Sequence, residues 1–134
     1  MDKELFRYDM QVRDYECDIQ GVVNNANYQH YMEHSRHEFL ISLGCSFSVL
    51  HNDGIDLMVS KATIEYKTSL RGGDRFYVSI SMKRSGAKLI CYQNIYRKPD
   101  DVLCAKGVID IICLQNGRLT RGEKFDELFR NVLA

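Results

Sequence analysis

The sequence lacks the features that mark membrane, secreted and nucleic-acid-binding proteins. No stretch approaches the roughly 18 consecutive apolar residues of a membrane-spanning helix, and the first residues, MDKELFRYDM, do not resemble a signal peptide. Lysine plus arginine and aspartate plus glutamate both number 18, so the formal net charge is zero. This balance argues against a large basic surface for nucleic acid and against an acidic solvating tail, and it leaves room for a small local basic patch. We therefore expect a cytoplasmic protein, and the absence of net charge favours self-association.

Cysteine and proline are also used sparingly. The five cysteines are odd in number and include no CxxC pair, which argues against a disulfide framework and a zinc site. We expect them to be reduced and mostly buried. The single proline lies in KPDD, where we expect a turn. With 134 residues the chain can bury one core, and we expect residues 1–134 to form one domain.

One long helix is predicted over residues 25–43. Apolar and small side chains recur there at the spacing of one helix face, while histidines and glutamates occupy the other. Asn24 or Asn25 is suited to cap its start, and Gly44 is suited to end it. The side chains expected on the buried face are Tyr28, Tyr31, Met32, Ser35, Phe39, Ser42 and Leu43.

Around this helix the period of the pattern changes to two, which predicts strands. The expected strands are residues 5–13, 55–69 with a bend or bulge, 76–83, 89–98 and 102–115, and a short helix over 123–132 closes the chain. Short connections favour consecutive strands as antiparallel neighbours. The expected fold is therefore α+β, with a curved antiparallel sheet wrapped around one long central helix. One helix leaves edges and a face uncovered, which favours pairing with a second copy.

The stretch DIQGVVNNANYQHY, residues 18–31, places a carboxylate shortly before the start of this helix. Free backbone N–H groups at a helix N-terminus favour negative charge and can stabilise an oxyanion. Asp18 can act on the same carbonyl as a general base or as a nucleophile, and Gly21 permits a tight approach. Such a site suits acyl transfer to water without a metal. The simpler interpretation is that Asp18 bonds its own turn and that the asparagines only cap the helix.

The segment RDYECDIQGVVNNANYQHYMEHSRHEFL, residues 13–40, resembles the hot-dog-fold thioesterases of the 4-hydroxybenzoyl-CoA and acyl-CoA thioesterase type. The later segment VSKATIEYKTSLRGGD, residues 59–74, resembles a strand and Gly-Asp turn of the same family. The residues that match the family signature on the loop and helix are Asp18, Gly21, Val22, Val23, Tyr28, Tyr31, Glu33 and Arg36.

This resemblance implies a thioester hydrolase that needs no metal and no cofactor. It implies that Asp18 is the catalytic carboxylate and that the backbone N–H of Asn25 polarises the thioester carbonyl. It also implies a homodimer or homotetramer with the active site at the subunit interface. Substrate contacts are then expected at Gly21, Val23, Asn24 and Tyr28.

The substrate carrier stays open between CoA and acyl carrier protein. The VNN pattern resembles the acyl-carrier-protein thioesterases, but Val22 and Gln20 replace the histidine and asparagine usual in that branch. Among the basic residues near the hairpin, Lys61 and Lys88 are expected to bind the phosphates of CoA. The alternative is that these lysines only protect a solvated strand edge.

Other residues and functions compete with this interpretation. The helix carries three histidines at positions 30, 34 and 37, but surface ion pairs with the nearby glutamates are favoured over a metal cluster. Cys17 is a weaker nucleophile candidate than Asp18, because neighbouring residues on a strand point to opposite sides. Glu65, expected within a strand, is interpreted as structural or interfacial. A hot-dog dehydratase would need a histidine facing Asp18, and a non-catalytic acyl-thioester-binding protein would tolerate Asp18→Asn.

Overall fold

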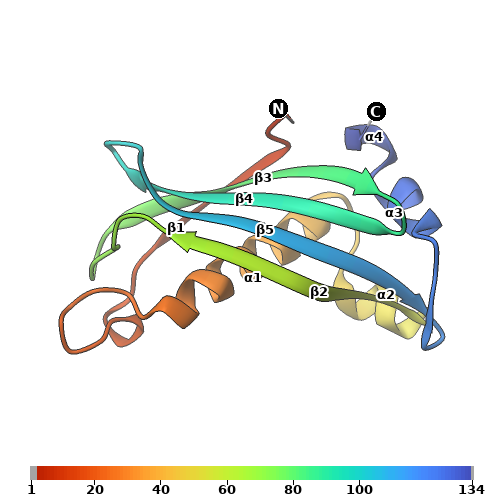
Figure 1. Cartoon of the computed structure of the whole chain (residues 1–134), viewed down its shortest axis with the longest axis horizontal. Coiled ribbons are helices and arrows are strands. Elements are labelled where there is room, and N and C mark those ends of the chain that lie inside the picture. The colour runs from red at the N-terminus through yellow and green to blue at the C-terminus, as the bar shows by residue number, and fades with distance from the viewer. Residues whose placement is uncertain (1–2, 134) are drawn as a thin grey trace.

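The structure is a computed structural model that describes residues 3–133. Its elements in chain order are β1 (Phe6–Gln11), η1 (Asp14–Glu16), α1 (Asn25–Ser42), α2 (Phe47–Asn52), β2 (Ile55–Tyr66), β3 (Arg75–Ser85), β4 (Lys88–Lys98), β5 (Val102–Gln115), β6 (Arg118–Leu119), α3 (Glu123–Leu128) and α4 (Arg130–Leu133). The strands form one antiparallel sheet, and α1 runs along one of its faces (Figure 1). The expected α+β arrangement of a curved sheet around one long helix is confirmed.

Helix α1 has the predicted start and end because both depend on local sequence. The side chain of Asn24 accepts a hydrogen bond from the N–H of Ala26 at 3.0 Å, which makes Asn24 the N-cap. Gly44 follows the last turn with a φ of +85°, a conformation that glycine adopts without strain. The cap decides which residue begins the helix, and the first helical residue is Asn25.

The buried face of α1 differs from the predicted one at its C-terminal end. Ser42 and Leu43 are exposed, whereas Arg36 and Leu40 are buried. Arg36 follows Met32 by four residues and therefore lies on the same face, although its charge placed it outside the apolar pattern. Where this face meets the sheet, a Cβ added at Gly107 of β5 would lie 2.7 Å from Met32 Sδ. Gly107 thus allows the helix to approach the sheet closely.

The strand order is β1-β3-β4-β5-β2, so the prediction that consecutive strands are neighbours is wrong for β2 and β3. β2 pairs with β5 at one edge, and its register shifts between Val59 and Lys61, which confirms the expected bulge. Residues 67–74 carry the chain across the end of the sheet to β3, beside β1 (Figure 1). Period-two alternation identifies faces and not neighbours, which is why the pattern did not reveal this crossing.

The C-terminal helix is divided, and three short elements were missed. α3 ends at Leu128 and α4 begins at Arg130, while Phe125 and Phe129 are buried in the core. The missed elements are η1, α2 and β6, each at most six residues long. Elements of this length contain too few residues to express a period.

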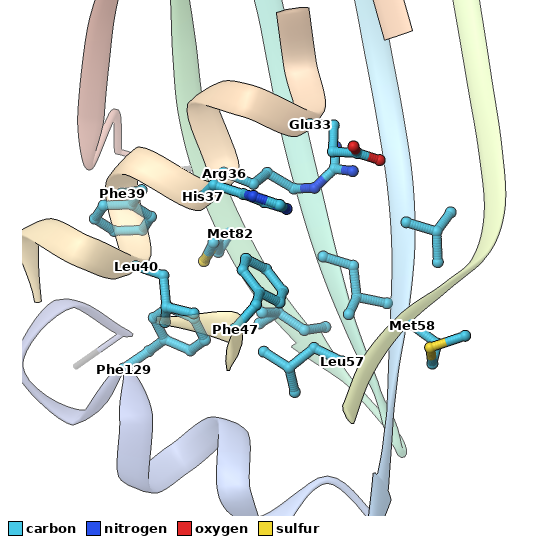
Figure 2. A pocket seen from close by; sticks show the side chains of 13 residues that line it. Glu33, Arg36, His37, Phe39, Leu40, Phe47, Leu57, Met58, Met82 and Phe129 are labelled. Carbon is cyan, nitrogen blue, oxygen red and sulfur yellow. The ribbon is translucent and has the colours of Figure 1, made fainter. Parts of the chain in front are cut away.

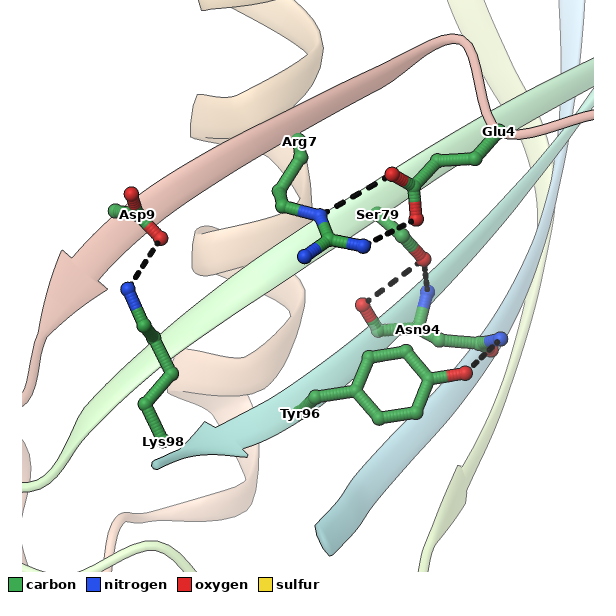
Figure 3. Close-up of polar contacts among 7 residues, drawn as sticks. All are labelled: Glu4, Arg7, Asp9, Ser79, Asn94, Tyr96 and Lys98. Atoms are coloured by element: carbon green, nitrogen blue, oxygen red, sulfur yellow. Dashed lines mark hydrogen bonds and ion pairs between the residues drawn. The ribbon is translucent and has the colours of Figure 1, made fainter. Parts of the chain in front are cut away.

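The face of the sheet turned away from α1 combines polar contacts with stacked tyrosines, among them Tyr77 and Tyr96. Figure 3 shows Arg7 donating to Glu4, Lys98 reaching Asp9 at 3.2 Å, and the Asn94 side chain donating to Tyr96 Oη at 3.3 Å. These contacts are solvent-accessible and contribute little to the free energy of folding. The described part of the chain holds no helix that combines the length and the apolar character needed to cross a bilayer.

Candidate active site

Asp18 lies on a tight loop that is closed at both ends by backbone pairing. Cys17 and Val23 form an antiparallel bridge, and the N–H of Asp18 donates to the carbonyl of Val22 at 2.9 Å. Gly21, with a φ of +78°, donates back to the carbonyl of Asp18 at 3.0 Å. This geometry needs glycine at position 21. It holds the backbone of Asp18 fixed while its side chain remains exposed.

The carboxylate of Asp18 is oriented by Gln20. Oδ1 accepts a hydrogen bond from the backbone N–H of Gln20 at 3.0 Å, the turn that the simpler interpretation of this residue predicted. In the orientation that satisfies its hydrogen bonding, the side-chain amide of Gln20 also donates to the two carboxylate oxygens, at 3.0 and 3.2 Å. Gln20 is therefore a candidate site residue, which the sequence analysis noted only as a departure from a family pattern.

The N-terminus of α1 begins two residues after this loop and leaves one N–H unused by its cap. The side chain of Asn24 accepts from Ala26, and its carbonyl accepts from the N–H of Asn27 at 2.9 Å. The N–H of Asn25, the first helical residue, has no hydrogen-bond partner among the residues that the structure describes. Asn25 is exposed to solvent. The helix dipole and this free donor together favour an anion or a developing oxyanion here.

The helix start is bonded to the residues 67–74 connection through Tyr28. The hydroxyl of Tyr28 is buried and accepts a hydrogen bond from the N–H of Leu70 at 2.9 Å. The carbonyl of Leu70 in turn accepts from the N–H of Val23 at 2.8 Å. Burial raises the pKa of Tyr28, so its hydroxyl stays neutral at physiological pH. Val23 and Tyr28 thus support the loop from inside the core, and Gly21 and Asn24 lie at its surface.

A small hollow of about 70 Å³ adjoins Asn25 and Tyr28. Residues from the end of β2 and the following connection complete its wall: Tyr66, Lys67, Thr68 and Ser69. The hydroxyl of Tyr66 donates to the carbonyl of Asn25 at 3.4 Å. A hollow of this size can hold only a small group, such as the carbonyl of a thioester.

A second network anchors the other side of the helix start. The carboxylate of Glu16 is 7% exposed and accepts the N–H of Arg13 at 2.8 Å and the hydroxyl of Tyr31 at 2.9 Å. Burial raises the pKa of Tyr31, which keeps its hydroxyl a donor. The carbonyl of Glu16 accepts the N–H of Asn24 at 3.0 Å. Both sides of the Asp18 loop are therefore fixed to the core.

The two predicted phosphate-binding lysines are not brought to this loop within one chain. Lys88 begins β4, whereas the connection that contacts the loop leads into β3 opposite the other end of β4. The Nζ of Lys88 lies 3.3 Å from the carboxylate of Asp110, and Lys61 stands across from Asp110 in the neighbouring strand. Asp110 thus offsets part of their charge.

The remaining candidates have ordinary surroundings. Burial raises the pKa of the Cys17 thiol, which disfavours the thiolate needed for nucleophilic attack. Glu65 forms an exposed ion pair with Lys67 at 3.3 Å. His34 lies 3.7 Å from Glu38, as predicted, and His30 contacts the side chain of Asn27. Glu33 and His37 have the same i, i+4 spacing, but they form none of the ion pairs found among residues 3–133.

Comparison with known proteins identifies relatives over most of the chain. Residues 12–133 match the thioesterase-like superfamily. The chloroplastic acyl-acyl carrier protein thioesterases ATL3 and ATL2 of Arabidopsis thaliana are 38% and 39% identical over 78% and 74% of this chain. The match covers 57% and 54% of those proteins, so the chain spans about half of their length.

Solved structures show the same architecture. A 1,4-dihydroxy-2-naphthoyl-CoA thioesterase from Synechocystis superposes with a TM-score of 0.86 at 19% identity, over 95% of this chain and 96% of that one. A hypothetical protein from Aquifex aeolicus gives a TM-score of 0.85 at 28% identity, over 92% of this chain and 98% of that one. These likenesses confirm the hot-dog fold that the sequence predicted.

Proposed function

The chain belongs to the thioesterase-like superfamily, and we propose that it hydrolyses acyl thioesters to a carboxylic acid and a free thiol. The observation that carries this proposal is the position of Asp18 on a closed loop whose last residue, Val23, lies two residues before Asn25, the first residue of α1. A carboxylate and an oxyanion donor are the two groups that metal-free hydrolysis of a thioester needs, and this loop and helix start supply one of each.

The two groups have complementary roles in the proposed reaction. Asp18 either removes a proton from the attacking water or attacks the carbonyl carbon itself, forming an anhydride that water then cleaves. The N–H of Asn25 stabilises the negative charge that develops on the carbonyl oxygen. Collapse of the tetrahedral intermediate breaks the C–S bond, and the thiolate leaves and takes up a proton. Gly21, Val23, Asn24 and Tyr28 shape the space around the reacting carbonyl.

The proposed substrate is an acyl group carried on CoA or on acyl carrier protein. The two Arabidopsis relatives, named as acyl-acyl carrier protein thioesterases, support the second carrier. Lys61 and Lys88 of a partner subunit would bind the phosphate groups of the carrier. Both CoA and acyl carrier protein present such groups.

We also propose that the chain acts as a homodimer or homotetramer. β2 forms one edge of the sheet and exposes large apolar side chains, with Met58, Val59 and Tyr66 each between 44% and 49% exposed. An unprotected edge of this kind favours pairing with another strand. The reduced state of all five cysteines is compatible with activity in the cytoplasm.

Free-thiol release tests the proposal directly. The protein and Asp18→Asn would be supplied with aryl-CoA, short-chain and long-chain acyl-CoA, and acyl-acyl carrier protein. We expect turnover by the unmodified protein and a decrease of about 10²–10⁴-fold in kcat for Asp18→Asn, the usual contribution of a catalytic base. Binding of acyl-CoA without thiol release by either protein would instead indicate an acyl-thioester-binding protein.

A further inference from the structure

The sheet is hollowed on both of its faces. On the side of α1, a cavity of about 400 Å³ has a mainly apolar lining that includes Phe47 and Phe129 (Figure 2). On the opposite side lies a hollow of about 520 Å³, here called the outer hollow, which is lined by polar and aromatic side chains of β3, β4 and β5 and by Glu4. Among the described residues, none of β2 and none of the candidate active site lines the outer hollow. Its volume is typical of pockets that hold small molecules.

Strand register places most of the lining in two neighbouring rows. Read from β3 through β4 to β5, the rows are Ser79–Asn94–Lys106 and Ser81–Tyr92–Val108. These residues alternate along each strand with residues of the core, so their side chains stand on the face turned away from α1. The two serines are small and leave a depression beside the longer side chains of β4. Ser79 is only 8% exposed although it lies on this outer face, which shows how far the depression is recessed.

Tyr96 presents a fixed aromatic ring at one end of the outer hollow. Its ring stacks on Tyr77 with centroids 5.2 Å apart, and the guanidinium of Arg7 lies over Tyr77 at 4.0 Å. Nδ2 of Asn94 donates to Tyr96 Oη at 3.3 Å, which holds the ring at its edge (Figure 3). Tyr92 precedes Tyr96 by four residues on β4, so their Cα atoms are about 13 Å apart. This separation leaves room for a planar group between the two tyrosine side chains.

The outer hollow has one cation without a partner carboxylate. Lys106 is exposed and occurs in none of the ion pairs found among residues 3–133. Glu4 also lines the hollow, but its two oxygens accept hydrogen bonds from Arg7 at 3.1 and 3.2 Å. Glu65 stands opposite Lys106 on β2, but its carboxylate lies 3.3 Å from Lys67. The hollow therefore offers a ligand one positive charge, which suits a monoanion.

We propose that the outer hollow binds a planar aromatic carboxylate, with its ring between Tyr92 and Tyr96 and its carboxylate on Lys106. Aromatic pairs gain most in offset-stacked or edge-to-face arrangements, and a fixed tyrosine ring offers such a contact without reorganisation. The hydroxyl of Ser81 and the amide of Asn94 can form hydrogen bonds with polar substituents of the ring. A saturated carboxylate would lose the ring contacts, and an uncharged aromatic compound would lose the contact with Lys106.

A titration followed by NMR tests the proposal, because the side-chain amide of Asn94 reports binding in the outer hollow directly. Three probes share their length and differ in one property each. Cinnamate has the planar ring and the charge, cinnamyl alcohol lacks the charge, and 3-cyclohexylpropanoate lacks the aromatic ring. We expect cinnamate to shift the Asn94 amide signals and to bind at least fivefold more tightly than either of the others. Equal affinities, or no shift of these signals, would overturn the proposal.

Substitutions separate the contributions of charge and ring. Lys106→Met should remove the preference for cinnamate over cinnamyl alcohol. Lys83→Met is the matched control, because Lys83 is an exposed lysine on the same face of β3 that does not line the hollow, and it should leave the preference unchanged. Tyr96→Leu should remove the preference for cinnamate over 3-cyclohexylpropanoate. Ser81→Trp fills the hollow and should weaken cinnamate binding at least tenfold, which keeps the test available if Tyr96→Leu does not fold.

A second copy of the chain is the other occupant that this face admits. Contact between two copies would shift the Asn94 amide signals as the protein concentration is raised without ligand. Such a dependence, combined with no response to cinnamate, would assign the face to self-association and overturn the ligand site. Asp18→Asn should leave cinnamate binding in the outer hollow unchanged. None of these measurements uses thiol release, so their failure would not bear on thioester hydrolysis.

Discussion

The hydroxyl of Tyr28 accepts a hydrogen bond from the backbone N–H of Leu70 at 2.9 Å, and both groups are buried. This contact joins the first turn of α1 to the connection between β2 and β3, 42 residues further along the chain. The connection formed by residues 67–74 is therefore bonded to the helix start. The carbonyl of Leu70 also accepts a hydrogen bond from the N–H of Val23, at the end of the Asp18 loop. The position of the loop depends on this pair.

Removing the Tyr28 hydroxyl should destabilise the fold measurably. Tyr28→Phe leaves the buried N–H of Leu70 without an acceptor, and we expect the free energy of unfolding in urea to decrease by about 1–3 kcal/mol. Tyr66→Phe is the matched control, because Tyr66 is 48% exposed and its hydrogen bond to Asn25 is long, at 3.4 Å. That variant should change the free energy of unfolding by less than about 0.5 kcal/mol. Equal effects of the two substitutions would contradict the importance given to the Leu70 contact.

The role of the Asn25 N–H can be tested because proline is tolerated at the first position of a helix. Asn25→Pro removes this N–H alone, and Asn24 already has the extended conformation, with φ −62° and ψ 137°, that a following proline requires. We expect the fold to be retained and kcat to decrease about 10²–10³-fold, as for loss of one oxyanion donor. Asn25→Ala changes the side chain and keeps the N–H, so it should retain activity within a few-fold. Steady-state thiol release together with circular dichroism would distinguish loss of catalysis from loss of structure.

Features that depend on contacts between residues close in the sequence were predicted correctly, and features that depend on contacts across the chain were not. The cap at Asn24, the end at Gly44 and most of the buried face of α1 follow from residues within a few positions of one another. The place of β2 beside β5 follows from pairing across half the chain, which alternation cannot identify. The burial of Arg36 was not predicted for the same reason. Its partner Gln93 lies 57 residues away, and a charged residue in a helical pattern is expected in solvent. The candidate loop was found because its residues are contiguous.

The close approach of α1 to the sheet at Gly107 makes a further prediction about the core. A methyl group at this position would lie 2.7 Å from Met32 Sδ and 3.2 Å from the carbonyl oxygen of Gln93. Met32 is fully buried, so its side chain has little room to move. We expect Gly107→Ala to lower the free energy of unfolding by about 1–3 kcal/mol through overpacking.

Shortening Met32 should relieve this strain and show that the two residues are coupled. Met32→Ala alone leaves a cavity and is expected to cost about 2–5 kcal/mol. In the double variant, the alanine methyl at 107 occupies part of that cavity, so the combined loss should be smaller than the sum of the single losses by at least about 0.5 kcal/mol. Urea unfolding of the four proteins measures this difference. Additive losses would mean that the sheet yields to the new methyl group and that the helix position does not depend on Gly107.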